Sequence, residues 1–524
     1  MPENFNLASA VWQHSLSAPQ SVAIAHNGKT LNYEQFAAQA QNVAQRLSQS
    51  PDWQQRSHKP MKVGILAARG MDACVAIVGA CWAGTTYVPI GLKLPKEKIQ
   101  AIFAACEFSA IIADVEGAKL LTDNVWSACP ELMVRIGQAF ESKSLDQSQA
   151  MPCQQPVQVN KQDLAYVIFT SGTTGVPKGV MIEAGSVQNY IQTMTRKLAM
   201  RATDRALETC DITFDVSVHN MFVTWQAGAA LYILSANLAM NAVKLARTEK
   251  LTIWNSVPSL VGMLQQLKAL QPGCLPDLRL SVFGGEALPH STASQWQAVA
   301  PNSAIFNLYG PTEATVFCLA QAFSPHTPIT AGRGFVSIGT PISGCEARVV
   351  DTDGQVVPDG MTGELVLGGV QLARGYLGAP ELTEQKFPVW NAKRWYLTGD
   401  YALRDASGDF HYLGRIDNQI KVFGHRVELE EIDAALRLVS GRDLVGAVAW
   451  PLVDGMAKGL VGFIAGSDLD QAQLLAGLKQ TLQPYMVPQQ VIALESMPLN
   501  ASGKVDRKAL TALLQETAHI VASV

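Results

Sequence analysis

The amino-acid sequence predicts an α/β protein with a β-rich part in its second half and a small α+β unit at its C-terminal end. Three observations indicate this class. Helical and strand patterns alternate as far as about Ser337. From there the sequence changes to short strands and Gly, Pro and Asp turns, as in "VVDTDGQVVPDGMTGELVLGG", which is typical of a small β-rich subdomain. After "YLGRIDNQIKVFGHRVE" a compact mixture of helices and strands follows, so we predict a domain boundary near Asp417.

The early elements follow from the spacing of apolar residues. The segment "NYEQFAAQAQNVAQRL" (32–47) has apolar residues at helical spacing, and "KVGILA" (62–67) is a short apolar strand. The segment "DACVAIVGACWAG" (72–84) is again helical, and "SAIIAD" (109–114) follows as a strand. This alternation predicts helices packed on mostly parallel sheets.

The C-terminal unit is predicted from four segments. An acid-rich helix, "ELEEIDAALRLVS" (428–440), comes before two strands, "VGAVAW" (445–450) and "GLVGFIAG" (459–466). A second helix, "DQAQLLAGLKQTL" (470–482), completes the unit. Internal repeats and low-complexity linkers are not found in the sequence.

Composition excludes several classes of protein. The chain has 524 residues, of which 48% are hydrophobic, so it can bury a large core in more than one domain. Its formal net charge is -4, and we find no long basic block, so a nucleic-acid partner is not expected. The cysteines are odd in number and scattered, which argues against a disulfide framework or a zinc site. They are Cys74, Cys81, Cys106, Cys129, Cys153, Cys210, Cys274, Cys318 and Cys345.

The sequence also predicts a cytoplasmic protein without a membrane partner. Its start, "MPENFNLASAVWQHS", lacks the basic and apolar regions of a secretory signal. The longest apolar run, from Ala73 to Ala83, is too short to span a bilayer. We therefore interpret it as a buried helix that leads into a strand.

The stretch "YVIFTSGTTGVPKGVMI" (166–182) contains the first candidate site, a loop over residues 170–179. Glycines in this loop allow close backbone approach, hydroxyls can donate hydrogen bonds, and a lysine supplies a cation, which together suit a polyphosphate. The residues concerned are Thr170, Ser171, Gly172, Thr173, Thr174, Gly175, Lys178 and Gly179.

Two alternatives exist for this loop. A P-loop needs Gly-Lys-Ser/Thr at the start of a helix. Here Pro177 precedes Lys178, Gly179 follows it, and "VMIEA" has the pattern of a strand, so a P-loop kinase or ATPase is disfavoured. An ordinary hairpin loop would explain the glycines, but it needs neither three hydroxyl donors nor a lysine.

With this loop in view, the sequence resembles the adenylate-forming superfamily, and in particular the free-standing amino acid adenylation enzymes of nonribosomal peptide synthesis. Nearly the whole chain is covered. Further stretches follow in the order of that family: "LNYEQ" (31–35), "GTTYVPI" (84–90), "FDVSV" (214–218), "NLYGPTE" (307–313), "GELVLGGVQLARGYL" (363–377), "YLTGD" (396–400), "GRIDNQIKVFGHRVELEEID" (414–433), "LQPYMVP" (482–488) and "SGKVDR" (502–507).

The resemblance implies a domain layout. An N-terminal adenylation core over residues 1–416 would contain two α/β subdomains and a β-barrel-like part at about 337–416. A mobile C-terminal lid over residues 417–524 would turn on a hinge at Asp417. Lys421, Gly424 and Arg426 lie on the stretch that family members turn into the site for a thioester half-reaction. Such closure lets one cavity serve two reactions.

Activation of a carboxylate by ATP brings two anions together, so a site for it needs positive charge and alignment. The resemblance implies ATP and Mg²⁺, with Glu313 as the Mg²⁺ ligand and Thr312 beside a phosphate oxygen. It implies that Lys504 bridges the substrate carboxylate and the α-phosphate, with Thr174 as a further catalytic residue. A lysine near a chain end is otherwise only solvated.

The nucleotide would be held by several motifs. Tyr309 and Tyr412 offer aromatic faces for adenine, and Asn307 an amide for its amino group. Asp400 can accept from both ribose hydroxyls and Arg415 can approach ribose or phosphate, although the two can instead form a salt bridge. The resemblance adds three further nucleotide-binding residues: Gly285, Glu286 and Gly310.

The substrate class is predicted from the pocket at residues 215–317. Asp215 matches the family residue that accepts the α-ammonium of an amino acid, although it can instead be a helix cap. The other aligned pocket residues are Val216, His219, Asn255, Val282, Gly284, Leu308, Val316 and Phe317. His219 and Asn255 are the polar members, so we expect a small, weakly polar substrate such as threonine, cysteine or serine, and a modest apolar one stays open.

Two departures and one absence complete the prediction. Gly91 and Leu397 stand where the family usually has an acidic and a basic residue, which affects local packing more than chemistry. No carrier domain or phosphopantetheine attachment motif follows Arg507, so we expect the aminoacyl group to pass to a separate carrier protein. An excised piece of a larger synthetase would look the same. The alternatives are an acyl- or aryl-CoA ligase, a D-alanine-type ligase, or a non-catalytic ATP-binding module that recruits a partner.

Overall fold

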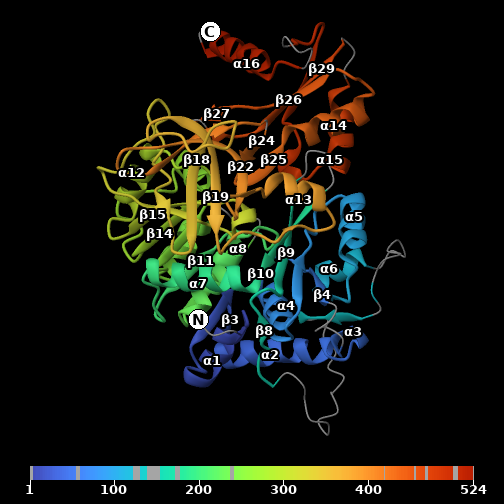
Figure 1. Cartoon of the computed structure of the whole chain (residues 1–524), viewed down its shortest axis with the longest axis vertical. Helices are drawn as coiled ribbons and strands as arrows, with labels where there is room; N and C mark the ends of the chain where they lie inside the picture. Colours follow the sequence, from blue (N-terminus) through green and yellow to red (C-terminus); the bar gives the residue numbers. More distant parts are fainter. Residues whose placement is uncertain are drawn as a thin grey trace.

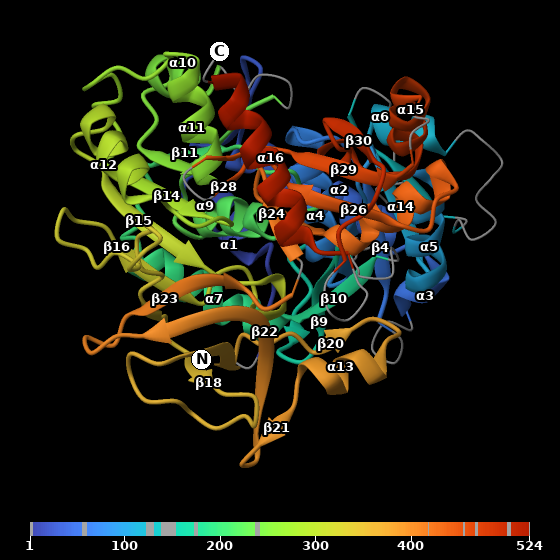
Figure 2. The same cartoon turned by 90° about the horizontal axis from the view of Figure 1, so that it is seen from above.

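Two large sheets lie side by side in the molecule, and the C-terminal unit lies across one end of both (Figure 1, Figure 2). The structure is a computed structural model. It describes residues 4–54, 60–121, 130, 132–137, 154–171, 177–235, 241–417, 419–453, 456–466, 470–499 and 505–522.

The first sheet has seven strands in the order β20-β10-β9-β5-β4-β6-β7. Its five strands from β9 to β7 run parallel, and β10 and β20 close one edge antiparallel. The strands are β4 (Lys62–Leu66), β5 (Thr86–Pro89), β6 (Ala110–Ala113), β7 (Met133–Arg135), β9 (Leu164–Thr170), β10 (Lys178–Glu183) and β20 (Gly375–Tyr376).

The second sheet has nine strands in the order β17-β16-β15-β14-β13-β11-β12-β2-β3. Its six central strands, from β15 to β2, are parallel, and the outer strands pair antiparallel. The strands are β2 (Val22–His26), β3 (Lys29–Asn32), β11 (Arg205–Glu208), β12 (Ala230–Ile233), β13 (Ile253–Ser256), β14 (Leu280–Gly284), β15 (Ala304–Tyr309), β16 (Leu319–Ala322) and β17 (Thr340–Pro341).

Helices cover both faces of the two sheets. Between the sheets, one buried cluster joins apolar residues of both inner faces to α2 (Tyr33–Leu47), α4 (Met71–Trp82) and α7 (Ala184–Lys197). The outer face of the seven-stranded sheet packs on α5 (Lys96–Cys106), and that of the nine-stranded sheet on α11 (Pro258–Gln266) and α12 (His290–Val299). The shorter helices are α1 (Ser9–Ser17), α3 (Pro51–Gln54), α6 (Val115–Leu120), α8 (Val216–Val218), η2 (His219–Val223), α9 (Thr224–Gln226), α10 (Ala242–Thr248), η4 (Thr312–Ala314) and α13 (Pro380–Lys386).

Local sequence explains where the central helices form. Helix α2 begins at a capping box, in which Asn32 Oδ1 accepts from Gln35 N at 2.8 Å and Gln35 Oε1 accepts from Asn32 N at 3.1 Å. Helix α4 is apolar almost all round because it is buried between the two sheets. The layered arrangement places the C-terminal ends of the parallel strands at one end of the molecule, where ligands of open α/β sheets usually bind.

An antiparallel sheet and a small C-terminal unit complete the fold. The antiparallel sheet holds β18 (Cys345–Val350), β19 (Thr362–Gly369), β21 (Val389–Trp390), β22 (Lys393–Arg404) and β23 (Phe410–Arg415). The C-terminal unit holds β24 (Gln419–Val422), β25 (His425–Glu428), α14 (Leu429–Ser440), β26 (Val445–Ala449), β27 (Leu452–Val453), β28 (Met456–Ala457), β29 (Leu460–Ala465), α15 (Gln471–Thr481), η5 (Pro484–Met486), β30 (Gln490–Leu494) and α16 (Arg507–Ala522). A two-stranded pair joins β1 (Asn4–Phe5) to β8 (Val159–Asn160).

The α/β class predicted from the sequence is confirmed, including the helices and strands expected at 32–47, 62–67, 72–84 and 109–114. The buried apolar clusters formed after residue 419 contain residues of that segment alone. The division into 1–416 and 417–524 and the hinge at Asp417 stay predictions.

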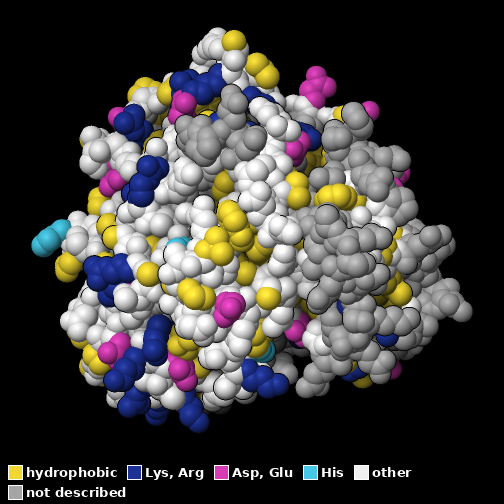
Figure 3. Space-filling model, turned by 90° about the horizontal axis from the view of Figure 1, so that it is seen from below, with side chains coloured by type: hydrophobic (Ala, Val, Ile, Leu, Met, Phe, Trp, Pro, Cys, Tyr) yellow, Lys and Arg dark blue, Asp and Glu magenta, His cyan; other side chains and the backbone are white. Residues whose placement is uncertain are grey.

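The sequence predicts neither a membrane-spanning helix nor a nucleic-acid partner. Among the described residues, no helix is both long and apolar enough to cross a membrane. On the face of the molecule shown in Figure 3, the described Lys and Arg side chains lie in several separate groups, with Asp and Glu between them. A continuous basic stripe, which nucleic-acid binding would favour, is not seen among the described side chains on that face.

Candidate active site

A cavity of about 140 Å³ opens where the two large sheets, the antiparallel sheet and the C-terminal unit meet. Segments far apart in the sequence line it. They include Thr170 and Ser171 at the end of β9, Asp215 and Val216 at the start of α8, Tyr309, Gly310 and Thr312 after β15, Asp400 and Arg415 of the antiparallel sheet, and Lys421, Gly424 and Arg426 of the β24–β25 hairpin. A second cavity of about 580 Å³ adjoins it and is lined by Gly285, Glu286, Asn307, Tyr309, Tyr412 and Arg415, among others.

The predicted phosphate loop joins two neighbouring strands. Thr170 at the end of β9 pairs with Lys178 at the start of β10, so the two ends of the loop lie side by side. Ser171 Oγ donates to the carbonyl oxygen of Arg426 at 2.7 Å, which ties the loop to the C-terminal hairpin. Burial lowers the pKa of Lys178, while the nearby Glu428 opposes this effect. Gly172, Thr173 and Thr174 lie outside the described residues.

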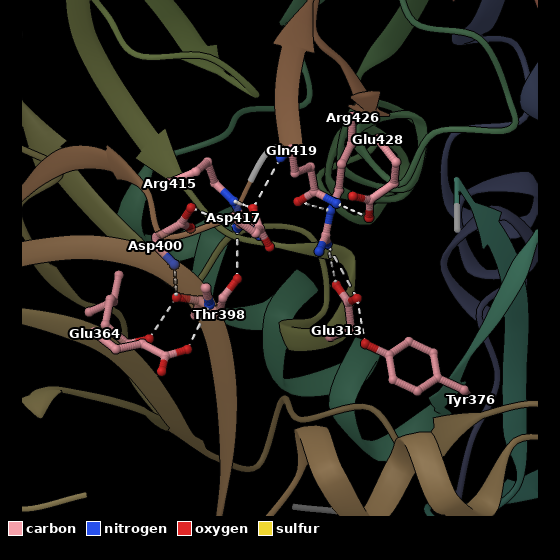
Figure 4. A network of polar contacts seen from close by, with 12 residues as sticks. Glu313, Glu364, Tyr376, Thr398, Asp400, Arg415, Asp417, Gln419, Arg426 and Glu428 are labelled. Carbon is pink, nitrogen blue, oxygen red and sulfur yellow. Dashed lines mark hydrogen bonds and ion pairs between the residues drawn. The ribbon is translucent and has the colours of Figure 1, made fainter. Parts of the chain in front are cut away.

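Asp400 lies in a chain of ion pairs (Figure 4). Arg415 Nη1 donates to Asp400 Oδ1 at 2.8 Å, and Arg415 Nε and Nη2 donate to the two carboxylate oxygens of Asp417 at 2.9 and 2.6 Å. Tyr309 Oη donates to Asp400 Oδ2. Burial alone would lower the pKa of Arg415, but the charges of Asp400 and Asp417 raise it. The salt bridge that the sequence left open as the alternative for Asp400 and Arg415 is therefore present, and Asp400 is only 6% exposed.

Asn307 and Glu286 both line the second cavity. Asn307 Nδ2 donates to the carbonyl oxygens of Ser337 and Val336, at 2.9 and 3.4 Å, and its Oδ1 has no partner among the described residues. Glu286 Oε2 accepts from Ser259 N at 2.9 Å and its Oε1 from Gly424 N at 2.5 Å. Burial raises the pKa of Glu286. Glu286 thus acts in this arrangement as a second anchor for the C-terminal hairpin.

Glu313 is 2% exposed and is surrounded by donors. Tyr376 Oη donates to Glu313 Oε1 at 2.8 Å, and Arg426 Nη1 lies 2.9 Å from Oε2 and 3.2 Å from Oε1 (Figure 4). Burial would raise the pKa of Glu313, but the charge of Arg426 and the hydrogen bonds from Tyr376 and Tyr396 together lower it. Gln419 links this cluster to Asp417, because its Oε1 accepts from Arg426 Nε at 2.5 Å and its N–H donates to Asp417 Oδ1 at 3.1 Å.

The residues around Glu313 fit a magnesium ion that is held mainly by phosphate and water. In the described part of the chain, no group of three or more His, Cys, Asp or Glu side chains could hold a metal by itself. Mg²⁺ in nucleotide sites commonly takes one or two carboxylates and completes its shell with phosphate oxygens and water. Glu313 offers such a carboxylate, at a position that already balances a positive charge.

Asp215 lies at the start of α8 and lines the main cavity. Burial raises the pKa of its carboxyl to about 6, while a hydrogen bond from the Thr312 side chain lowers it. The side chain of Asp215 makes no N-cap hydrogen bond, so the helix-cap alternative is not what holds it. Among the described residues, no Lys or Arg forms an ion pair with Asp215.

The predicted side-chain pocket is assembled but closed. Asp215, Val216 and Phe317 line the main cavity, whereas the other six predicted members are buried outside its lining: His219, Asn255, Val282, Gly284, Leu308 and Val316. Tyr190 Oη and His219 Nδ1 are 2.6 Å apart, and burial lowers the pKa of His219 to about 3, so the imidazole is neutral. Lys504 lies outside the described residues.

Sequence reasoning missed three contributors to this site. It named Arg426 only as part of the thioester stretch, although it pairs with Glu313. It quoted Gln371 and Tyr376 inside "GELVLGGVQLARGYL" without assigning either a role. A buried carboxylate such as Glu313 requires donors, and that requirement is the signal that could direct attention to Tyr376 and Arg426.

Comparison with known proteins identifies the family. The model of the family described as "AMP-binding enzyme" matches residues 11–377. Zwittermicin A synthase ZmaJ of Bacillus cereus is 31% identical over 508 residues, which cover 94% of this chain and 92% of that protein. The crystal structure of the Vibrio cholerae adenylation domain AlmE in complex with glycyl-adenosine-5'-phosphate is 29% identical, has a TM-score of 0.81, and is matched over 97% of this chain and 98% of that chain.

Other relatives are far longer than this chain. Tyrocidine synthase 3 of Brevibacillus parabrevis is 31% identical over 97% of this chain, but the chain spans only 8% of that protein. The family match covers more than half of the chain, and ZmaJ is matched over nearly its full length. This chain therefore belongs to the family of AMP-binding enzymes and is an adenylate-forming ligase that uses ATP.

Proposed function

We propose that this enzyme activates a small α-amino acid as its adenylate and then transfers the aminoacyl group to the phosphopantetheine thiol of a separate carrier protein. In the first step, a substrate carboxylate oxygen forms a bond to the α-phosphorus of ATP, and the bond to pyrophosphate breaks. In the second step, the thiol sulfur bonds to the acyl carbon, AMP leaves, and the thiol proton is released. We therefore expect the protein to be cytoplasmic, because ATP and carrier proteins occur in the cytoplasm.

One observation carries the choice of an amino acid. Asp215 is a cavity-lining carboxylate that forms no direct ion pair among the described side chains; burial raises its pKa, and the charge of Lys421, which lines the same cavity, only partly offsets this. A buried carboxylate is unfavourable unless a cation pairs with it. The α-ammonium of an amino acid would supply that cation, and the AlmE structure, which holds a glycyl adenylate, supports the same substrate class.

The remaining roles are proposed from the geometry around the two cavities. The amide oxygen of Asn307 has no partner among the described residues and would accept from the adenine amino group, and Tyr309 and Tyr412 line the same cavity. Asp400 would accept from the ribose, with Arg415 fixing its orientation. Glu313 would hold Mg²⁺, which supplies charge neutralisation at the phosphates when bound. Lys504 and Thr174, which both lie outside the described residues, would contact the reacting phosphate.

The lining of the main cavity supports the proposed thiol acceptor. This lining also includes Pro89, Gly91, Leu94 and Lys98 of the core and Tyr485 of the C-terminal unit. This wall is partly apolar and lies between the two parts of the chain, which suits the arm of a phosphopantetheine group. Lys98 Nζ and Glu431 Oε1 form an ion pair there, with side chains 13% and 4% exposed.

Exchange of labelled pyrophosphate into ATP, measured with a panel of amino acids, tests the first step. Asp215→Ala should weaken amino acids more than their deaminated analogues, and equal losses would defeat the ammonium assignment. The second step is tested by supplying coenzyme A and a phosphopantetheinylated carrier protein in parallel. Faster transfer to coenzyme A than to the carrier protein would indicate a coenzyme A ligase instead.

The expectation of threonine, cysteine or serine needs a polar group at the side-chain end of the pocket. The sequence predicts that Asn255 and His219 supply it, and neither lines the cavity. Phe317, which does line the cavity, is therefore the pocket residue that a small substrate side chain would meet.

A further inference from the structure

Phe317 lines the main cavity together with Asp215, the proposed partner of the substrate ammonium. Its ring lies so close to Gly284 that a Cβ atom at Gly284 would be 2.5 Å from Phe317 Cε1 and 2.6 Å from Cζ. On its other side the ring meets the imidazole of His219, with the centroids 5.6 Å apart and the planes at 70°. His219 is one helical turn beyond Asp215, so the ring closes the pocket about one turn from the ammonium-binding carboxylate.

The backbone around Phe317 is fixed in an unusual conformation. Thr315 and Val316 have φ values of 56° and 68°, and two consecutive β-branched residues in this region need support from their surroundings. That support comes from Gln371, which is 1% exposed. Its Nε2 lies 3.2–3.4 Å from the carbonyl oxygens of Ala314, Thr315 and Phe317, and its backbone oxygen accepts from Thr315 Oγ1 at 2.6 Å.

Gln371 is itself held from the opposite side. Asn189 Nδ2, on helix α7, donates to Gln371 Oε1 at 3.0 Å and to the carbonyl oxygen of Ser343 at 3.0 Å. The amide of Gln371 is therefore oriented by one neighbour while it holds the turn before Phe317. The backbone that carries Phe317 therefore cannot shift without breaking several buried hydrogen bonds.

The closed pocket also lacks a partner for a polar substrate side chain. Beyond Asp215, the cavity lining shared with the predicted pocket is Val216 and Phe317, both apolar. Asn255 Oδ1 is buried without a hydrogen-bond partner among the described residues, and Asn255 is not part of the cavity lining. A hydroxyl placed against Val216 and Phe317 would lose its hydrogen bonds to water without replacement.

From these observations, and resting on the proposed function, we propose that Phe317 is a specificity-determining residue that closes the pocket. It limits the substrate to the smallest amino acids, with glycine preferred and alanine next. Gln371 is a positioning residue that holds the backbone of Phe317 so that its ring closes the pocket. Threonine is disfavoured twice, by its volume and by its unpaired hydroxyl, and serine and cysteine are disfavoured less.

The test is a comparison of amino acids on the full chain. In pyrophosphate exchange by the wild-type enzyme, we expect kcat/KM for glycine to exceed that for alanine by about tenfold and that for threonine or valine by more than about a hundredfold. Phe317→Ala should raise kcat/KM for valine and leucine at least tenfold and lower that for glycine. Gln371→Leu should weaken the discrimination between glycine and valine while the KM for ATP changes little.

A binding measurement keeps the proposal testable if variants fold poorly. Wild-type enzyme should bind the non-hydrolysable glycyl sulfamoyl-adenosine at least a hundredfold more tightly than the threonyl form, by calorimetry. The contact itself is tested by Gly284→Ala, which should lower the melting temperature in the wild-type background and lower it much less together with Phe317→Ala.

The outcomes separate this inference from the function on which it rests. Wild-type enzyme that prefers threonine, serine, cysteine or a larger amino acid would overturn the inference and leave amino acid activation standing. Exchange with no amino acid, together with no binding of any aminoacyl sulfamoyl-adenosine, would overturn both.

Discussion

Arg426 and Glu313 form an ion pair across the boundary between the C-terminal unit and the core, with 2.9 Å between Nη1 and Oε2. The carboxylate is 2% exposed and the guanidinium 24%. The same hairpin contacts the core through Gly424 N and Glu286 and through Arg426 O and Ser171. The hairpin therefore places a positive charge at the proposed ligand of Mg²⁺. Arg426 and the metal ion would compete for one carboxylate.

This competition predicts how the free enzyme responds to magnesium. Arg426→Met should leave the carboxylate of Glu313 buried without a counter-ion, which typically costs about 3–5 kcal/mol. We expect a lower melting temperature without nucleotide, and a partial recovery when Mg²⁺ is added. The wild-type enzyme should respond to Mg²⁺ much less, since Arg426 already neutralises Glu313.

The matched control is Arg404→Met. Arg404 forms a solvent-exposed pair with Asp359 at 3.6 Å, and such pairs contribute little. If both variants lowered the melting temperature equally and neither responded to Mg²⁺, the proposed competition of Arg426 and Mg²⁺ for Glu313 would be wrong.

A second prediction concerns pH. Burial raises the pKa of the Asp215 carboxyl to about 6, and only its ionised form can accept the ammonium of the substrate. In the free enzyme, kcat/KM for the amino acid should therefore be level above pH 7 and fall about tenfold for each unit of pH below about 6. Exchange measured between pH 5 and 8 checks this. Asp215→Asn should be weak throughout and lose the decline, whereas Asp211→Asn, on the exposed turn nearby, should keep it.

A third prediction concerns Lys504, which lies outside the described residues and keeps the role that the sequence motif implies. Lys504→Ala should reduce exchange by several orders of magnitude while ATP still binds with near-normal affinity. Lys479→Ala, at an exposed position on helix α15 of the same unit, is the control and should exchange normally. Near-normal exchange by Lys504→Ala would remove Lys504 from the proposed chemistry.

A fourth prediction concerns stability. Glu208 is 3% exposed, its Oε1 accepts from Asn220 Nδ2 at 2.9 Å and from Cys210 N at 2.5 Å, and its Oε2 has no partner among the described residues. Burial raises the pKa of this carboxyl to about 7. Because the folded state holds the proton more tightly than the unfolded state, stability should fall as pH rises from about 4.5 to 7.

Glu208→Gln should remove this dependence, since an amide keeps the acceptor oxygen without the charge. The variant should gain roughly 3 kcal/mol at most over the wild type at pH 8, and little at pH 5. Thermal unfolding at the two pH values measures the difference. Glu116→Gln, at a side chain that is 58% exposed, should change neither value.

Much of the candidate site could be predicted from the sequence because its residues come from motifs at strand ends. Thr170, Asn307 and Tyr309 lie at or near the C-terminal ends of parallel strands, which bring such residues to one place, whereas Asp400 comes from strand β22 of the antiparallel sheet. The α/β class followed from the spacing of apolar residues for a related reason: a helix or strand must bury one side whatever its neighbours are.

The parts that escaped prediction depend on how separate segments pack. The pairing of Arg426 with Glu313 depends on where the C-terminal hairpin docks, which no local pattern specifies. The closure by Phe317 depends on the left-handed turn at Thr315 and Val316 and on support from Gln371, which lies in a later segment of the sequence. The aligned pocket residues therefore predicted apolar walls with two polar members, Asn255 and His219, although both side chains lie outside the cavity lining.

The support of Phe317 by Gln371 and Asn189 has a consequence for engineering. Transplanting only a contiguous block such as residues 215–317 from another adenylate-forming enzyme would set a foreign turn against the native Gln371 and Asn189. Such a chimera would keep the recipient's Gln371 and Asn189 but lose the native turn at Thr315 and Val316 that Gln371 supports. A change of substrate by grafting should succeed more often when three further elements are transplanted with the block: strand β19, the segment after it, and helix α7.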